Sequence, residues 1–360
     1  MRTPLLLAVL RDPGRMADLA PPDWDLLVRQ CASANLIPSL LVLAEEHGLA
    51  ERLPGRVREH VGWWRAQAVR QVQAVRFEAI NIAAALQPTG LPLVLLKGAA
   101  YTMAELRAGR GRLYSDVDIL VPKARLDEVE AALMLHGWAA THLDAYDQRY
   151  YRAWMHELPP LRHVLRRTGI DVHHAILPET APVRPDPTRL LAAARPLAGH
   201  PGLAVLAPVD MVLHSATHLF FESELEKGVR DLLDLHYLFG ELGVASGFWE
   251  ALAPRAAELQ LGRPLFYALR YCRRLLDTPV PAAAIDAVAR HAPPAPLLWL
   301  MDRLFERALL PPHASCADAF TAPARFLLYL RGTWLRMPPL LLARHLFHKA
   351  FLSPRVEPLA

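Results

Sequence analysis

The chain contains few lysines, few cysteines and no long apolar segment. Only four lysines stand among 40 basic residues, so arginine carries nearly all of the positive charge. The three cysteines are Cys31, Cys272 and Cys316. They are far apart and form no CxxC pair, which argues against a disulfide framework or a structural zinc site and predicts a reducing, cytoplasmic setting.

No segment reaches the roughly 18 uncharged apolar residues that a membrane span needs. The apolar run in residues 4–10 is short and is soon followed by charge and proline, so it does not predict a signal peptide. We therefore expect a soluble protein. Its 360 residues and 53% hydrophobic content suffice for a large core with two or three subdomains, and its net charge of +4 is compatible with an anionic substrate.

Three regions differ in their pattern of apolar residues. Residues 1–88 show helical spacing, with a long helix expected over 56–87. Within residues 89–187, the segment 91–177 predicts the order β-α-β-α-β-β, and its last two strands, 154–165 and 169–177, form an antiparallel pair turned at 166–169. Residues 188–360 are expected to be helical again, with breaks at prolines. The sequence thus predicts an α+β fold, in which a small mixed-sheet core is flanked by N-terminal and C-terminal helical regions.

The segment "LYSDVDILV" (113–121) is typical of a buried strand, yet it carries two aspartates. Alternate side chains of a strand point to the same face, so Asp116 and Asp118 would project together. Burying like charges this close is costly unless a cation lies between them or the end of the strand is open to water. The pair alone therefore leaves two explanations, a metal site and a solvated strand end.

Other polar residues accompany neighbouring strands of the same region. Lys97 and Gly98 end the first strand, and a basic loop over 107–112 precedes the aspartate pair. Asp171 lies in "IDVHH" on a later strand. Three carboxylates on adjacent strands suit one or two Mg²⁺ or Mn²⁺ ions, because these ions prefer hard oxygen ligands and can bridge nucleotide phosphates. The order of these residues favours the metal site over the solvated strand end.

This arrangement resembles the nucleotidyltransferase superfamily that includes DNA polymerase β and the aminoglycoside nucleotidyltransferases. Within it, "LLKGAAYT", "RLYSDVDILV" and "IDVHHAIL" are most similar to the bacterial family of uncharacterised nucleotidyltransferases. A helical N-terminal segment and a downstream helical segment with histidines (214–238) extend the resemblance over most of residues 25–240. The resemblance implies that 89–187 form a nucleotidyltransferase core.

The resemblance also implies roles for individual residues. Asp116 and Asp118 match the metal-binding Asp-x-Asp, and Asp171 matches the third carboxylate, so all three would be catalytic and metal-binding. Gly98 and Ala99 occupy the Gly-Ser turn of the superfamily. Ala99 replaces the usual serine, and the interval from Gly98 to Asp116 is longer than in polymerase-like members.

Cationic and hydroxyl side chains complete the expected nucleotide site. Lys97 and Arg112 would compensate for the missing serine hydroxyl as contacts to the phosphates. Ser115, next to the aspartate pair, is also expected to bind the nucleotide.

Several further residues have two interpretations. His173 shares a strand face with Asp171 and would orient that carboxylate or contact the substrate; a buried histidine beside the sheet is the alternative. His214 and His218 stand four residues apart on a predicted helix, where a structural role is favoured over a metal or phosphate contact. Asp231 is expected to pair with an arginine or to cap a helix, although one such aspartate accompanies the histidine in the resembling family.

The C-terminal segment 324–352 interleaves arginines with large apolar residues. It would either make a peripheral contact with a membrane or a partner, or cover the core with its arginines extended to solvent. The second interpretation is favoured.

These observations predict a metal-dependent transferase of the nucleotidyltransferase class. It would move an NMP from an NTP, with ATP as the expected nucleotide and Mg²⁺ or Mn²⁺ as the cofactor, to a hydroxyl-bearing acceptor. The acceptor stays open among a small molecule, a peptide, a protein and an RNA end, but no stripe of basic and aromatic residues predicts a nucleic-acid track. The alternatives are a non-catalytic partner of the same fold in a biosynthetic cluster, and a metal-dependent glycosyltransferase that uses Asp-x-Asp.

Overall fold

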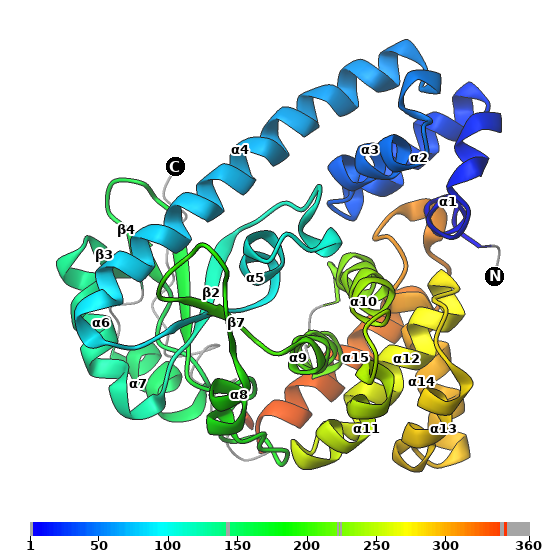
Figure 1. Ribbon diagram of the computed structural model, residues 1–360. Coiled ribbons are helices and arrows are strands. Elements are labelled where there is room, and N and C mark those ends of the chain that lie inside the picture. Colours follow the sequence, from blue (N-terminus) through cyan, green and yellow to red (C-terminus); the bar gives the residue numbers. More distant parts are fainter. Residues whose placement is uncertain (1–2, 142–144, 222, 224, 339–341, 344–360) are drawn as a thin grey trace.

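The structure is a computed structural model, and it describes residues 3–141, 145–221, 223, 225–338 and 342–343. Within these residues the chain forms an α+β fold, with one seven-stranded mixed sheet surrounded by helices (Figure 1). The predicted fold class is thus confirmed.

The elements of the described residues begin with helices, continue as alternating strands and helices, and end with helices. The helices are α1 (Leu5–Arg11), α2 (Pro21–Ser33), α3 (Ile37–Glu46), α4 (Gly55–Leu86), α5 (Lys97–Met103), α6 (Leu126–Leu135), α7 (Ala145–Trp154), α8 (Pro187–Ala193), α9 (Pro208–Phe221), α10 (Gly228–Leu242), α11 (Phe248–Glu258), α12 (Gly262–Leu276), α13 (Ala282–Val288), α14 (Ala295–Ala308) and α15 (Thr321–Arg336). The strands are β1 (Leu93–Leu95), β2 (Asp116–Leu120), β3 (Trp138–Ala140), β4 (Leu161–His163), β5 (Gly169–His173), β6 (Arg195–Pro196) and β7 (Leu203–Val205).

Strand β2 lies in the middle of the sheet, whose order is β3-β4-β5-β2-β1-β7-β6. It pairs antiparallel with β1 and parallel with β5, in a register that sets Asp118 opposite Asp171. Because side chains alternate along a strand, Val117 and Ile119 point away from the aspartates, and both are buried in the core. One face of β2 is therefore apolar, and the other presents carboxylates.

The long helix predicted over 56–87 is confirmed as α4. It runs across the sheet and extends beyond it toward α2 and α3 (Figure 1). Its buried residues include Val75, Ala79, Ile82 and Leu86, whose three- and four-residue spacing forms one apolar stripe. Contacts of α4 with β1, β2 and β7 hold this stripe against the sheet.

Parts of the sheet differ from the sequence prediction. The chain is not helical throughout after residue 188, because β6 and β7 lie there and β7 pairs parallel with β1. The antiparallel pairing of β4 with β5 is confirmed, but the strand predicted over 154–165 is reduced to the three residues of β4. Strand β3, which the sequence does not predict, pairs with β4. The sheet thus extends beyond residue 187 through short strands.

The first helices pack against the last ones. Helix α1 contacts α12, and Nε of Arg11 donates to the carbonyl oxygen of Leu275 at 2.9 Å. The side-chain amide of Gln30 on α2 donates to Ser315 Oγ at 2.8 Å, and its oxygen accepts from the amide of Leu6. The N-terminal helices therefore pack against the C-terminal helical region.

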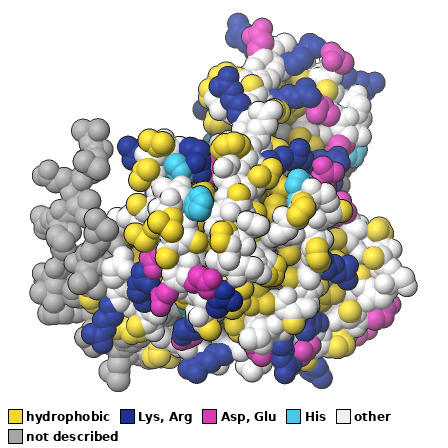
Figure 2. Space-filling model, turned by 60° about the vertical axis from the view of Figure 1, so that its left-hand side comes forward, with side chains coloured by type: hydrophobic (Ala, Val, Ile, Leu, Met, Phe, Trp, Pro, Cys, Tyr) yellow, Lys and Arg dark blue, Asp and Glu magenta, His cyan; other side chains and the backbone are white. Residues whose placement is uncertain are grey.

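The surface mixes acidic, basic and hydrophobic side chains over the face seen in Figure 2. Within the segment 324–352, helix α15 exposes Phe326, Leu330 and Trp334, and most of the residues after 338 lie outside the described part of the chain. The role of this segment stays a prediction. Among the described helices, none is both long and apolar enough to pass through a bilayer.

Candidate active site

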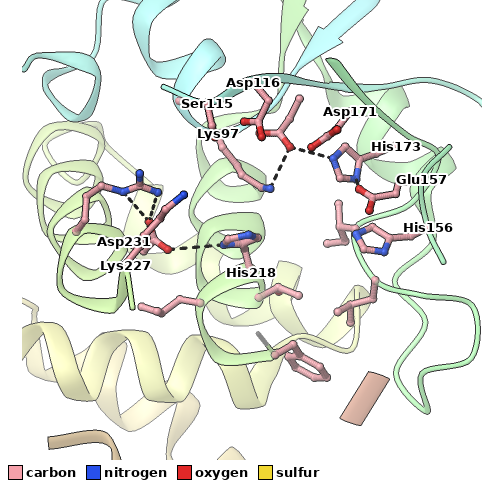
Figure 3. Close-up of a pocket in the computed structure, with 18 of the residues that line it drawn as sticks. Lys97, Ser115, Asp116, His156, Glu157, Asp171, His173, His218, Lys227 and Asp231 are labelled. Carbon is pink, nitrogen blue, oxygen red and sulfur yellow. Dashed lines mark hydrogen bonds and ion pairs between the residues drawn. The ribbon is translucent and has the colours of Figure 1, made fainter. Parts of the chain in front are cut away.

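A cavity of about 370 Å³ lies between the carboxylate face of the sheet and helices α9 and α10. The turn after β1, strands β2 and β5, and the segment between α7 and β4 form its sheet side. The ends of α9 and α10 form its helix side, and Arg336 of α15 also reaches it. In Figure 3, Asp116 and Asp171 lie on the sheet side, across from His218 and Lys227.

Asp116, Asp118 and Asp171 converge in this cavity. One carboxylate oxygen from each side chain lies within 4.8 Å of the others. The sheet causes this convergence, because Asp116 and Asp118 share a face of β2 and Asp171 stands opposite Asp118 on the parallel strand β5. The structure therefore brings together the three carboxylates that the sequence assigns to a metal site.

The three carboxylates differ in their electrostatic surroundings. Burial and the charge of Asp118 raise the pKa of Asp116. Burial and the charges of Asp118 and Asp116 raise the pKa of Asp171 to about 7. Burial also disfavours the charge of Asp118, but Lys97 and His173 outweigh it and hold the pKa of this carboxyl well below its usual range. The carboxylate of Asp118 is thus paired with cations, whereas those of Asp116 and Asp171 lie close to other negative charges. A bound divalent cation would reduce this repulsion.

The donor set fits Mg²⁺ or Mn²⁺. All three side chains offer hard carboxylate oxygens, which these ions prefer over nitrogen and sulfur ligands. All three also line the cavity, so oxygen atoms of water or of a phosphate can complete the coordination shell.

Lys97 occupies the start of α5 in a left-handed backbone conformation. Its φ is +43°, an uncommon value for a residue other than glycine, and backbone strain of this kind clusters at functional sites. Its Nζ atom lies 3.1 Å from Oδ1 of Asp118. Burial lowers the pKa of Lys97, but Asp118 and Asp116 outweigh this effect and raise it. Lys97 is therefore a cation held beside the carboxylates.

A second source of positive charge is the start of α10, which the sequence analysis did not assign to the site. Lys227 is exposed just before this helix, and Arg230 follows three residues later. Arg230 donates to Oδ1 of Asp231 at 2.7 Å. Nδ1 of His218 lies 3.9 Å from Oδ2 of the same aspartate. The scarcity of lysine was a usable signal, because Lys97 and Lys227 are two of only four lysines and both line this cavity.

The comparison with known families agrees with this geometry. A family model described as "Uncharacterised nucleotidyltransferase" matches residues 20–277. The chain belongs to this family. The resemblance noted from the sequence is thereby confirmed, and the matched range contains the three aspartates and the start of α10. No curated protein matches the sequence.

Membership in this family implies a nucleotide as substrate. The cluster of acidic side chains fits a metal-dependent nucleotidyltransferase, since divalent cations hold the phosphates in such enzymes. For the other residues that the sequence analysis assigned to the nucleotide, the structure gives less direct support.

Packing leaves no room for a side chain at Gly98, which lies in the turn that the sequence analysis compared with the Gly-Ser turn of the superfamily. A Cβ atom at this position would lie 2.6 Å from Nε of Arg112 and 3.0 Å from the ring of Tyr114. Arg112 itself is buried and forms an ion pair with Asp234 on α10. Its guanidinium therefore connects the segment before β2 to the C-terminal helices, and its contact with phosphates stays a prediction. Ala99 is buried within α5.

The other arginines of the loop over 107–112 are also paired. Arg107 forms an ion pair with Glu46 on α3, and its guanidinium carbon lies 3.7 Å from the ring centre of Tyr237. Nη1 of Arg110 lies 3.7 Å from the same carboxylate. These two arginines hold the loop against α3 and α10.

Of the three candidate histidines, His173 and His218 line the cavity and His214 lies in the core. Nε2 of His173 lies 3.0 Å from Oδ1 of Asp118, and Nδ1 lies 3.4 Å from Oε2 of Glu157. His214 is buried on α9, and burial holds its pKa well below the usual range. His218, one turn later, lines the cavity. His173 therefore contacts Asp118, whereas the sequence analysis expected it to orient Asp171, and that orienting role stays a prediction.

Glu157 and its neighbour His156 line the cavity but were missed in the sequence analysis. They lie in the segment between α7 and β4, where the predicted strand does not form, so alternation could not give the direction of their side chains. No local signal distinguishes them from other polar residues of such a segment.

Proposed function

We propose that the protein transfers a nucleoside monophosphate from an NTP to a hydroxyl-bearing acceptor, with divalent metal ions held by Asp116, Asp118 and Asp171. The observation that carries the proposal is the convergence of these three carboxylates, with oxygen atoms within 4.8 Å of one another. Family membership supplies the nucleotide, and ATP is the first to test.

Each carboxylate would have its own role. Asp116 and Asp118 would hold the metals, and Asp171 would complete the second metal position next to the acceptor. Bound Mg²⁺ or Mn²⁺ would neutralise phosphate charge and lower the pKa of the acceptor hydroxyl. The contacts of Lys97 and His173 with Asp118 keep that carboxylate charged and oriented.

The phosphates would lie between the aspartates and the start of α10. Lys227 and Arg230 supply positive charge there, and Lys97 supplies it from the sheet side. The first amide groups of α10 add the positive end of a helix dipole. Ser115 lines the cavity beside Asp116, where its hydroxyl can donate to a phosphate oxygen.

In the proposed step, the acceptor oxygen forms a bond to the α-phosphorus while the bond from that phosphorus to the α-β bridging oxygen breaks. Pyrophosphate leaves with the electron pair of the broken bond, and the carboxylate of Asp171 accepts the proton of the hydroxyl. The protein would lower the barrier mainly by positioning the reactants and neutralising charge.

The position of Asp171 also bears on the two alternatives. A glycosyltransferase that relies on Asp-x-Asp gives no role to a third carboxylate on the next strand, so the convergence favours nucleotidyl transfer. A non-catalytic protein of the same fold would keep the nucleotide site without turnover. Only a measurement of transfer separates that alternative from an enzyme.

Transfer can be measured with full-length protein, Mg²⁺ and α-³²P-labelled ATP, using a small-molecule cell extract and the protein itself as sources of acceptor. We expect labelled product and released pyrophosphate in equal amounts. Asp116→Asn and Asp118→Asn should each lower the rate at least about 100-fold, because metal binding contributes several kcal/mol of charge stabilisation to the transition state.

Asp25→Asn is the matched control, since Asp25 is an exposed aspartate that pairs with Arg29 on α2. It should keep the activity of the unmodified protein. Transfer that persists in both active-site variants would contradict the proposal. Metal-dependent ATP binding without pyrophosphate release in any acceptor mixture would instead favour the non-catalytic alternative.

A further inference from the structure

A second group of potential metal ligands lies beside the three aspartates. It consists of His156 and Glu157, which follow α7, and His173 on β5; one ligand atom from each lies within 4.8 Å of the others. All three side chains line the cavity. The proposed nucleotidyl transfer uses none of them as a metal ligand.

The surroundings of His173 favour a cation at its Nδ1 atom. Nε2 lies 3.0 Å from Asp118 and Nδ1 lies 3.4 Å from Glu157, so the buried ring stands between two carboxylates. A neutral imidazole has one N–H group, and its second nitrogen presents a lone pair. One of the two carboxylates therefore faces a lone pair unless a proton or a metal ion occupies that nitrogen.

His156 contributes an imidazole nitrogen without a partner. Its Nδ1 atom is buried and forms no hydrogen bond within the described part of the chain. Its ring centre lies 5.2 Å from that of His173. Buried polar atoms without a partner are uncommon, and an ion is one of the usual reasons for them. This observation is independent of the carboxylates and concerns a residue of the same group.

We propose that His156, Glu157 and His173 bind one divalent transition-metal ion of the zinc type. Two imidazole nitrogens and one carboxylate oxygen form a donor set that such ions take readily, whereas the three aspartates offer only the hard oxygens that suit Mg²⁺. Nδ1 of His173 binds the ion while its Nε2–H group donates to Asp118, as metal-bound histidines commonly do to a carboxylate. Because the ligands line the cavity, the ion keeps one position open to water or a substrate.

The two cation sites are linked through Asp118. An ion on Nδ1 of His173 fixes the tautomer that donates to Oδ1 of Asp118, which leaves Oδ2 of the carboxylate to the aspartate site. The transition metal therefore positions a carboxylate that nucleotidyl transfer is proposed to use. Its binding requires no nucleotide, so the inference does not depend on the proposed function.

Co²⁺ is a suitable probe, because Co²⁺ bound in a four- or five-coordinate histidine site absorbs visible light much more strongly than Co²⁺ surrounded by six oxygens. Full-length, metal-free protein is titrated with Co²⁺ in excess Mg²⁺ and without nucleotide. We expect one equivalent of Co²⁺ to bind with a strong visible band. His156→Ala and Glu157→Gln should each weaken this binding at least about tenfold, since each removes a direct ligand.

Two variants serve as controls. His60→Ala removes an exposed imidazole of α4 and should leave the Co²⁺ titration unchanged. Asp171→Asn removes a carboxylate of the aspartate site but no ligand of the proposed ion, so it should also leave the visible band in place.

A band that depends on Asp171 but not on His156 would place the ion with the aspartates and overturn the proposal. The absence of a band in the unmodified protein would overturn it as well. X-ray absorption on the Zn²⁺-loaded, unmodified protein answers the question even where a variant fails to fold. We expect two imidazole ligands to the zinc ion, and fewer than two would overturn the proposal.

Discussion

Asp171 destabilises the folded protein when no metal is bound. Burial and the charges of Asp118 and Asp116 raise its pKa to about 7, whereas an aspartate in an unfolded chain has a pKa of about 3.9. Between these two pH values the folded state binds more protons than the unfolded state. The free energy of unfolding therefore falls as the pH rises from about 4 to about 7. Above that range the whole of this loss of stability is present.

We expect Asp171→Asn to raise the free energy of unfolding of the metal-free protein at about pH 8 by up to about 4 kcal/mol, because the difference between pKa values of about 7 and about 3.9 corresponds to that free energy and an amide does not ionise. Near pH 4 the two proteins should be about equally stable. Urea denaturation in the presence of a chelator measures both values. Asp286→Asn, an exposed substitution on α13, is the control and should change neither. A loss of stability in Asp171→Asn at the higher pH would contradict the explanation.

Lys227 is expected to bind nucleotide phosphates and is not one of the proposed metal ligands. Lys227→Ala should weaken binding of a non-hydrolysable ATP analogue about tenfold, because a charge-assisted contact is lost. Binding of Mn²⁺ alone should stay the same. Lys123→Ala is the matched control, since Lys123 is exposed and pairs with Glu179. Calorimetric titration of both variants tests the prediction, and equal affinities would refute it.

The sequence predicted part of this site, because part of it depends on local geometry. Asp116 and Asp118 share a face through strand alternation alone, and Asp171 joins them through one parallel pairing. Other contacts depend on the tertiary fold. The partner of Arg112 lies 122 residues later on α10, and Glu157 lies before β4, in a segment where the predicted strand does not form. A sequence pattern cannot reveal such contacts.

At the scale of elements, the turn from β1 into α5 packs closely only because Gly98 has no side chain. Gly98→Ala would push against Nε of Arg112 and the ring of Tyr114, and we expect it to cost about 1–3 kcal/mol of stability. Thermal or urea denaturation measures this cost.

Gly240→Ala provides the contrast for that variant. A Cβ atom at Gly240, on α10, meets nothing within 4 Å. Because alanine favours helix more than glycine does, this substitution should stabilise the protein by about 0.5–1 kcal/mol. If both alanine variants shift stability in the same direction, the packing argument for Gly98 is wrong.

Element length influenced which strands could be predicted, although the three-residue β1 was predicted from its continuous apolar run. β2 and β5 have five residues each and show alternation, and α4 has 32 residues with a clear apolar stripe. β7 has only three residues, all buried, and its place in the sheet comes from its parallel pairing with β1. Three residues are too few for a period to appear, so no pattern indicated that the sheet continues beyond residue 187.

At the scale of the whole molecule, one buried ion pair joins the segment before β2 to the C-terminal helices. Arg112 and Asp234 are 8% and 7% exposed. Asp234→Ala would leave the guanidinium buried without this carboxylate, and we expect a loss of about 3–5 kcal/mol in the free energy of unfolding. Chemical denaturation measures this loss.

The exposed pair of Glu51 and Arg58 is the control for this prediction. Glu51→Ala should be nearly neutral, because surface ion pairs contribute little. A small effect of Asp234→Ala, similar to that of the control, would show that the buried pair does not hold the two regions together.

The hydrogen bond between Gln30 and Ser315 has a consequence for synthesis. The two residues are separated by 285 positions, and α1 rests on α12. On the ribosome, the first helices therefore emerge long before their packing partners have been translated. Until then, the part of α1 that rests on α12 remains open to water, so the nascent chain exposes surface that the folded protein covers.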